Sequence, residues 1–119
     1  MNKLIVLLLA SFLSISMFSQ QSEDYTTLLQ LVSKAHNQKE AVLIYDEFDP
    51  VLKESLGKEA FFKMMDSLHT EKGTFLNYEL ILEEDKGKNF LVDFDNGSML
   101  LFIELQPNKK ISSFNIKDY

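Results

Sequence analysis

The sequence predicts an α+β domain in which three helices pack on one face of a curved, four-stranded antiparallel sheet, after a cleaved signal peptide. Three observations carry this prediction. A run of apolar residues after Lys3 is typical of an exported chain. Up to Gly73, apolar residues recur at steps of three and four, as in helices, and beyond Gly73 they alternate with polar residues, as in strands. A chain of 119 residues provides for one domain.

Residues 1–20 are predicted to be the signal peptide. Lys3 gives a positive start, residues 4–18 are largely apolar, and Ser19-Gln20-Gln21 offers a processing point. This run is shorter than the roughly 20 apolar residues of a membrane-spanning helix, so no permanent membrane span is expected. An uncleaved anchor and a buried N-terminal helix are the alternatives. Residues 21–119 are expected to form a single domain in the periplasm or outside the cell.

The three helices are predicted at residues 23–36, 39–48 and 57–71. The first has an apolar stripe at three- and four-residue steps, formed by Tyr25, Leu28, Leu29 and Val32 and continued by Ala35 or His36. The second ends at Asp49, because the residue before a proline is disfavoured in helical geometry, and Pro50 can open a short turn. The third ends at Gly73, a natural helix stop.

The four strands are predicted at residues 76–83, 90–95, 99–105 and 110–116. Asp85-Lys86-Gly87 is expected to form the first turn, and Asn96-Gly97 is the strongest short signal for a hairpin. The third strand is almost entirely apolar and should be central. In the fourth, Ile111 is out of phase with the later apolar residues, which predicts a bulge.

The second face of this sheet is expected to be partly apolar. Phe75, Ile81, Leu91 and one side of the third strand should point away from the helices. An apolar face of this kind needs a cover, which could be the C-terminal tail, a second copy of the chain or another partner. A homodimer through the sheet face is therefore a specific expectation.

Composition excludes several classes of function. The chain has no cysteine, which removes disulfides, thiolate nucleophiles and cysteine-based metal sites. All 12 basic residues are lysines, and the net charge is −6. Without arginine and with this negative charge, neither nucleic acid nor an anionic membrane is an expected partner.

Several segments resemble a known family. They are Ile44 to Phe48, Leu56 to Phe62, the Lys72-Gly73 helix exit and the ending Lys110 to Phe114. Together they are similar to a family of small secreted bacterial domains of unknown function in the nuclear transport factor two-like, cone-shaped superfamily. Its members occur alone or beside serine hydrolase domains. The family often has a glycine shortly after the isoleucine of the final strand, where this chain has Ser112-Ser113. The resemblance implies a cone-type fold and carries no active-site residues.

No motif in the sequence indicates catalysis or metal binding. His36 and His69 lie on different predicted helices without a spaced partner, which favours ordinary surface or helix-end positions. The stretch from Asp93 to Glu104 resembles part of a calcium loop, but Gly97 stands at the fifth place instead of the sixth, and a hairpin explains it better. The acidic clusters at 46–49 and 83–85 are expected to be solvated. No cofactor and no metal is expected.

The leading hypothesis is an exported binding or protein-interaction module without catalysis. Its partner would be a small apolar ligand held between the helices and the sheet, or another envelope protein. The predicted pocket residues are Tyr25, Leu29, Tyr45, Phe61, Met65, Tyr78, Val92 and Phe102. The alternative is a small isomerase- or dehydratase-like enzyme with its site inside the cone. Its catalytic residue would be Tyr25, Tyr45 or Tyr78. A subunit for a separately encoded hydrolase is a third possibility.

Overall fold

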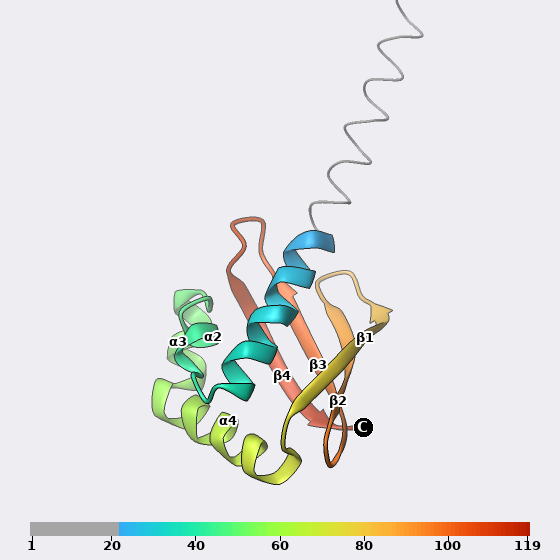
Figure 1. Cartoon of the computed structure of the whole chain (residues 1–119). Coiled ribbons are helices and arrows are strands. Elements are labelled where there is room, and N and C mark those ends of the chain that lie inside the picture. Colours follow the sequence, from blue (N-terminus) through green and yellow to red (C-terminus); the bar gives the residue numbers. More distant parts are fainter. Residues whose placement is uncertain (1–21) are drawn as a thin grey trace, which may run out of the picture.

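The computed structural model describes residues 22–119 (Figure 1). The signal peptide predicted at residues 1–20 lies outside the described residues. From the N-terminus, the described elements are a helix at residues 22–37, α2 (Val42–Tyr45), α3 (Pro50–Leu56), α4 (Lys58–Lys72), β1 (Phe75–Glu83), β2 (Lys88–Phe94), β3 (Gly97–Leu105) and β4 (Ile111–Asp118). Within residues 22–119, no helix is long and apolar enough to cross a membrane.

The sheet is an open antiparallel meander in the order β1-β2-β3-β4, as the alternating pattern predicts. The bulge predicted in the fourth strand is confirmed. Glu104 pairs with Ser113 while its neighbour Leu105 pairs with Ile111, so β4 contains one extra residue at this point. This extra residue turns Ile111 into the core, where it is fully buried.

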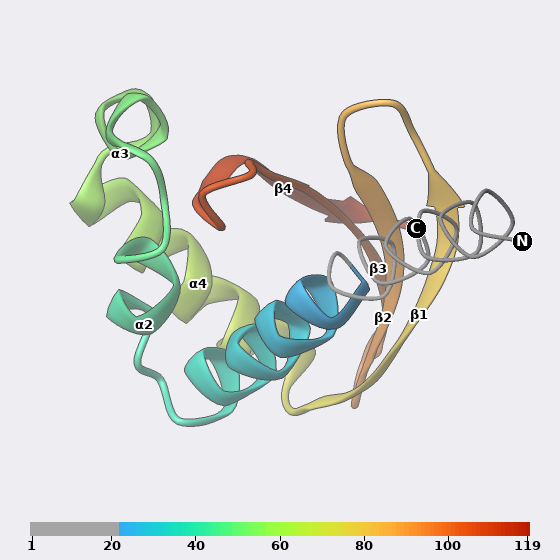
Figure 2. The same ribbon diagram turned by 90° about the horizontal axis from the view of Figure 1, so that it is seen from above.

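The hydrophobic core lies between the first helix and the sheet. Figure 2 shows this helix crossing the concave face of the sheet, with α2, α3 and α4 grouped on the side of β4. Leu29 of the helix and Leu101 and Ile103 of β3 are each 0% exposed. On the β4 side, the Phe61 ring of α4 lies 4.9 Å from that of Phe48, measured between centroids. These apolar contacts join both groups of helices to one core.

The helix predicted at residues 39–48 is wrong in length, because only Val42–Tyr45 is helical. Lys39 leaves helical geometry with φ of 57°, and residues 47–49 instead run beside β4. The Asp49 N–H donates to Ile111 O and the Ile111 N–H donates to Glu47 O, both at 2.8 Å. Pairing with a strand therefore replaces the last predicted helical turn, and it covers one end of the β4 edge.

The residues predicted as a turn after Pro50 form the helix α3 instead. Pro50 occupies its first turn, where no helical hydrogen bond requires an N–H. The Asp49 side chain caps this helix by accepting a hydrogen bond of 2.8 Å from the Leu52 N–H. Local capping is therefore sufficient to make a helix of a segment that is too short to show an apolar stripe.

The predicted facing of β1 is wrong for Phe75, which lies in the core at 4% exposure instead of pointing away from the helices. Leu76 is 57% exposed. The reason is an irregular register, because the pairing with β2 shifts near both ends of the strand. Each shift reverses the faces that the later residues present. β1 therefore carries exposed apolar side chains along an edge that no described residue pairs with, namely those of Leu76, Leu80, Ile81 and Leu82.

Candidate ligand-binding site

The residues predicted to line an interior pocket mostly form packed core. Leu29 and Val92 are 0% exposed, Phe61 is 2% exposed, and Tyr45 and Tyr78 pack at the edge of the same cluster. Phe102 does not join them. It stands between Leu101 and Ile103, which face the core, so alternation along β3 places Phe102 on the opposite face of the sheet. The space between the first helix and the sheet is therefore filled by side chains.

The tyrosines proposed for catalysis do not converge on one point. The Tyr25 hydroxyl accepts a hydrogen bond of 3.1 Å from the Leu105 N–H, and the Lys88 ammonium lies 4.7 Å from the Tyr25 ring centroid. Burial raises the pKa of Tyr25, although the Leu105 hydrogen bond opposes this effect. The Tyr45 hydroxyl donates to the carbonyl oxygen of Lys53 at 3.4 Å. Both hydroxyl groups are thus engaged in hydrogen bonds with nearby backbone groups.

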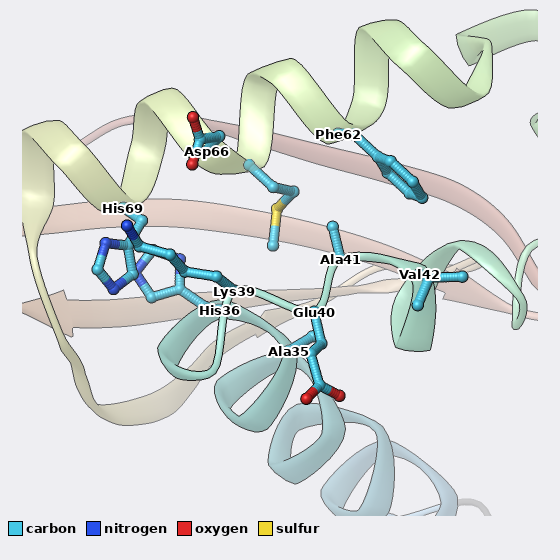
Figure 3. A pocket seen from close by; sticks show the side chains of 10 residues that line it. Ala35, His36, Lys39, Glu40, Ala41, Val42, Phe62, Asp66 and His69 are labelled. Carbon is cyan, nitrogen blue, oxygen red and sulfur yellow. The ribbon is translucent and has the colours of Figure 1, made fainter.

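An open hollow lies elsewhere, between the end of the first helix, the segment that follows it and α4 (Figure 3). We call it the histidine groove. Its volume is about 370 Å³. Its apolar wall is formed by Ala35, Ala41, Val42, Phe62 and Met65, and its polar residues are His36, Lys39, Glu40, Asp66 and His69. Met65 is the one member of the predicted pocket that lines it.

The C-cap of the first helix places its last residues along this groove. The Glu40 N–H donates to Ala35 O at 2.8 Å, and the Lys39 N–H donates to His36 O at 3.3 Å. This paired arrangement is a Schellman C-cap, whose left-handed position is usually a glycine. Lys39 occupies that position with φ of 57°. The chain therefore tolerates backbone strain where a lysine side chain extends along the groove toward the two imidazoles (Figure 3).

His36 is the most deeply buried polar side chain of the groove, at 2% exposure. Its Nε2 lies 2.6 Å from the carbonyl oxygen of Gly73. A carbonyl oxygen only accepts hydrogen bonds, so Nε2 carries the proton and Nδ1 presents a lone pair. Nδ1 is buried and has no hydrogen-bond partner among the described residues.

His69 lies directly beside His36. The two ring centroids are 5.1 Å apart, and the ring of Phe94 lies 5.0 Å from His36 in an edge-on arrangement. Burial lowers the pKa of His36; the hydrogen bond to Gly73 opposes this, and the charge of His69 adds to it. His36 is therefore neutral near pH 7, and its Nδ1 is available as an acceptor.

The polar residues of the groove do not form a metal centre. Among residues 22–119, no group of three or more histidine, aspartate and glutamate side chains is placed to hold a metal ion. Asp93, which the sequence offered as the start of a calcium-like loop, accepts a hydrogen bond of 2.6 Å from the Ser98 hydroxyl. That bond lies within the β2–β3 hairpin.

Comparison with family models, with curated proteins and with solved structures gave no significant match.

The sequence pattern did not predict this groove. His36 and His69 are far apart in the chain, and each considered alone favours an ordinary helix-end position. They meet because α4 packs alongside the end of the first helix, which no local pattern specifies. One signal was available, since position 36 continues the apolar stripe through Val32. A histidine at a core position needs a hydrogen-bond partner, and this expectation would have identified His36 as a residue of interest.

Proposed function

We propose that this protein is an exported, non-catalytic binding domain that holds a small, largely apolar molecule in the histidine groove. One observation carries the proposal: an open, largely apolar hollow is lined by His36, whose Nδ1 is buried and has no hydrogen-bond partner within residues 22–119. Small-molecule sites characteristically combine apolar walls with a few well-placed polar groups. Buried polar atoms are nearly always hydrogen-bonded, so an unpartnered acceptor at the end of such a hollow favours a ligand there.

The volume of the groove limits the size of this ligand, and its position differs from that of the predicted pocket. A volume of about 370 Å³ lies at the small end of the range for ligand sites. The groove lies beside the sheet, whereas the sequence analysis placed the pocket between the first helix and the sheet. That interior holds Leu29 and Val92 at 0% exposure and leaves no room for a molecule.

Export is part of the proposal and depends on residues 1–20, whose pattern is that of a signal peptide. Expression of the full chain with recovery of the protein from the periplasm or the medium tests it. The intact mass of the recovered protein should correspond to a chain that begins within two or three residues of Gln21. A protein that stays in the cytoplasm at full mass would contradict export.

The binding proposal can be tested with indole as the probe. Titration followed by ¹H–¹⁵N NMR should show saturable shifts at residues that line the groove. Ala41→Phe fills the hollow and should abolish these shifts, while Val51→Phe adds the same ring to an exposed position on α3 and should leave them intact. An absence of saturable shifts in the groove, or unchanged binding by a folded Ala41→Phe protein, would contradict the proposal.

The alternative is a small enzyme of the isomerase or dehydratase kind that uses His36 as a general base. The specific observation in its favour is the same neutral imidazole, because a base needs an unprotonated nitrogen near the operating pH. Acetophenone in D₂O provides a direct test, since a base in the groove would exchange its α-protons for deuterium. Exchange that is faster with the protein than with His36→Gln would favour the enzyme.

A further inference from the structure

We propose that the histidine groove selects its ligand through a single hydrogen-bond donor: the ligand is a small, uncharged aromatic molecule whose one O–H or N–H group donates to Nδ1 of His36. This inference depends on the proposed binding function and narrows it to a class of ligand, namely simple phenols and indoles.

The first step is that the acceptor at His36 is fixed in place. Its Nε2–H is held by Gly73 O, and the two residues that follow Gly73 are anchored by side chains. The Thr74 N–H donates to Asp95 Oδ2 at 2.8 Å, and the Phe75 N–H donates to Asn37 Oδ1 at 2.8 Å. A flipped ring would set the Cε1–H group against the carbonyl oxygen of Gly73, and the other neutral tautomer would set a bare Nε2 there; both lose the bond. The opposite nitrogen, Nδ1, therefore always presents an acceptor.

The second step is that only a donor satisfies this atom. A buried acceptor without a partner is costly, and a ligand that supplies a donor removes that cost on binding. A carboxylate ligand would set an acceptor against an acceptor. A charged ligand of either sign would also lose its water along a wall of Ala41, Phe62 and Met65, and the charged lining residues are of both signs, so the groove favours neither. An uncharged O–H or N–H group meets both conditions.

The third step concerns access to Nδ1. His69 is half-buried and lies beside His36, and Lys39 extends along the groove from the C-cap (Figure 3). A ligand would reach Nδ1 by rotation of these two side chains, a movement that needs no change of the backbone. Side-chain rotations of this kind are fast, so they allow rapid exchange of a small ligand.

The fourth step concerns the body of the ligand. Ala35 and Ala41 are small and leave the hollow open, while Phe62 and Met65 of α4 offer an aromatic ring and a thioether along its wall. Figure 3 shows the Phe62 ring at the end of the groove away from the histidines. Aromatic rings and thioethers both make favourable contacts with flat aromatic molecules. A ligand with one ring system and a donor at one end fits this arrangement.

Two pairs of probes test the inference on the purified protein. p-Cresol is compared with toluene, which lacks the hydroxyl group, and indole is compared with 1-methylindole, whose nitrogen cannot donate. The donor-bearing member of each pair should bind about tenfold more tightly. The ¹⁵N resonance of His36 Nδ1, seen in long-range ¹H–¹⁵N spectra, should move with p-cresol and stay in place with toluene.

Substitutions provide the second arm of the test. His36→Gln places an amide N–H where Nε2 donates to Gly73 and removes the Nδ1 acceptor, so the difference within each pair should disappear. Lys63→Gln, on the exposed side of α4 and outside the groove, should keep the difference. If His36→Gln does not fold, the wild-type resonance of Nδ1 decides the question.

The outcomes separate this inference from the proposed function. Equal binding within each pair, without a shift of the Nδ1 resonance, would overturn the inference that the ligand must donate to Nδ1. The proposed function of the groove in binding would stand. Failure of all four probes to bind in the groove would overturn both. A folded His36→Gln protein that still prefers p-cresol to toluene would overturn the assignment to Nδ1.

Discussion

The imidazole of His36 donates a hydrogen bond of 2.6 Å to the carbonyl oxygen of Gly73 and so ties the end of the first helix to the exit of α4. The next residue repeats the connection, because the Asn37 side chain accepts from the Phe75 N–H and donates to the Phe75 carbonyl oxygen, at 2.8 and 3.2 Å. Two consecutive side chains thus hold the passage from helix to sheet. His36 therefore has a structural contact through Nε2, while its Nδ1 has no hydrogen-bond partner among the described residues.

The contact between His36 and Gly73 leads to a prediction about stability. His36→Leu leaves the Gly73 carbonyl oxygen without its partner and should lower the free energy of unfolding by about 1–3 kcal/mol. His36→Gln retains a donor and should lose less. Urea unfolding followed by circular dichroism measures both values. Equal losses in the two variants would show that packing, and not this hydrogen bond, determines the contribution of His36.

The lowered pKa of His36 leads to a prediction about pH. The unfolded chain binds a proton at His36 more readily than the folded protein does, so the stability that neutral His36 contributes is complete above about pH 6.5. This contribution falls as the pH drops below that value toward the folded pKa. The urea midpoint should therefore decrease between pH 7.5 and 5.5, and it should decrease less in His36→Gln.

The comparison with His36→Gln is needed because other charged groups face the same groove. His69 and Asp66 reach it from α4, and Lys39 and Glu40 reach it from the C-cap of the first helix. All four remain in the variant, so their titration affects both proteins. An identical pH dependence in the two proteins would rule out His36 as its source.

Tyr25 provides a prediction for the opposite end of the first helix. Tyr25→Phe keeps the ring and removes the oxygen that accepts from the Leu105 N–H. The free energy of unfolding should fall by about 1–2 kcal/mol, because a half-buried N–H loses its partner. Tyr119→Phe is the matched control at a 79% exposed position and should change stability by less than about 0.5 kcal/mol.

The left-handed backbone at Lys39 predicts a stabilising substitution. Glycine adopts this conformation without the steric cost that any side chain imposes. Lys39→Gly should therefore be about 1 kcal/mol more stable than Lys39→Ala, and both remove the ammonium group from the groove. Thermal and urea unfolding measure the difference. Similar stabilities would show that the C-cap does not strain the lysine.

The homodimer predicted from the sequence remains a proposal, and two residues on the outer face of the sheet would form the centre of its interface. Leu91 of β2 and Leu100 of β3 are cross-strand partners on the face opposite the core, and both are half-buried within one chain. Light scattering coupled to size-exclusion chromatography should detect a dimer that Leu91→Lys dissociates. Lys63→Gln on α4 should leave it unchanged. A monomer at high concentration would contradict the proposal.

The sequence pattern predicted most of the elements whose signals are local. Alternation gave four strands in the correct order, and the phase error at Ile111 correctly located a bulge. Phe75 was misassigned because the irregular register of β1 with β2 is not visible in β1 itself. The helix expected to reach Phe48 stops earlier because residues 47–49 pair with β4, which lies more than 60 residues away. Interactions between distant parts of the chain decided these two errors, and they also form the groove. The missed helix α3 is different, because its cap at Asp49 and Pro50 is local but the segment is too short to show an apolar stripe.

The pairing of residues 47–49 with Ile111 has a consequence for the order of folding. The helical half packs against Ile111 and Phe114, which are buried members of the core, so it cannot complete its packing until β4 is present. Contacts that span so much of the chain form late and slowly, because a long loop must close first. A nascent chain would therefore stay unfolded until almost all of the described residues had left the ribosome. That delay would suit the proposed export, in which the chain is threaded through a narrow translocation channel before it folds.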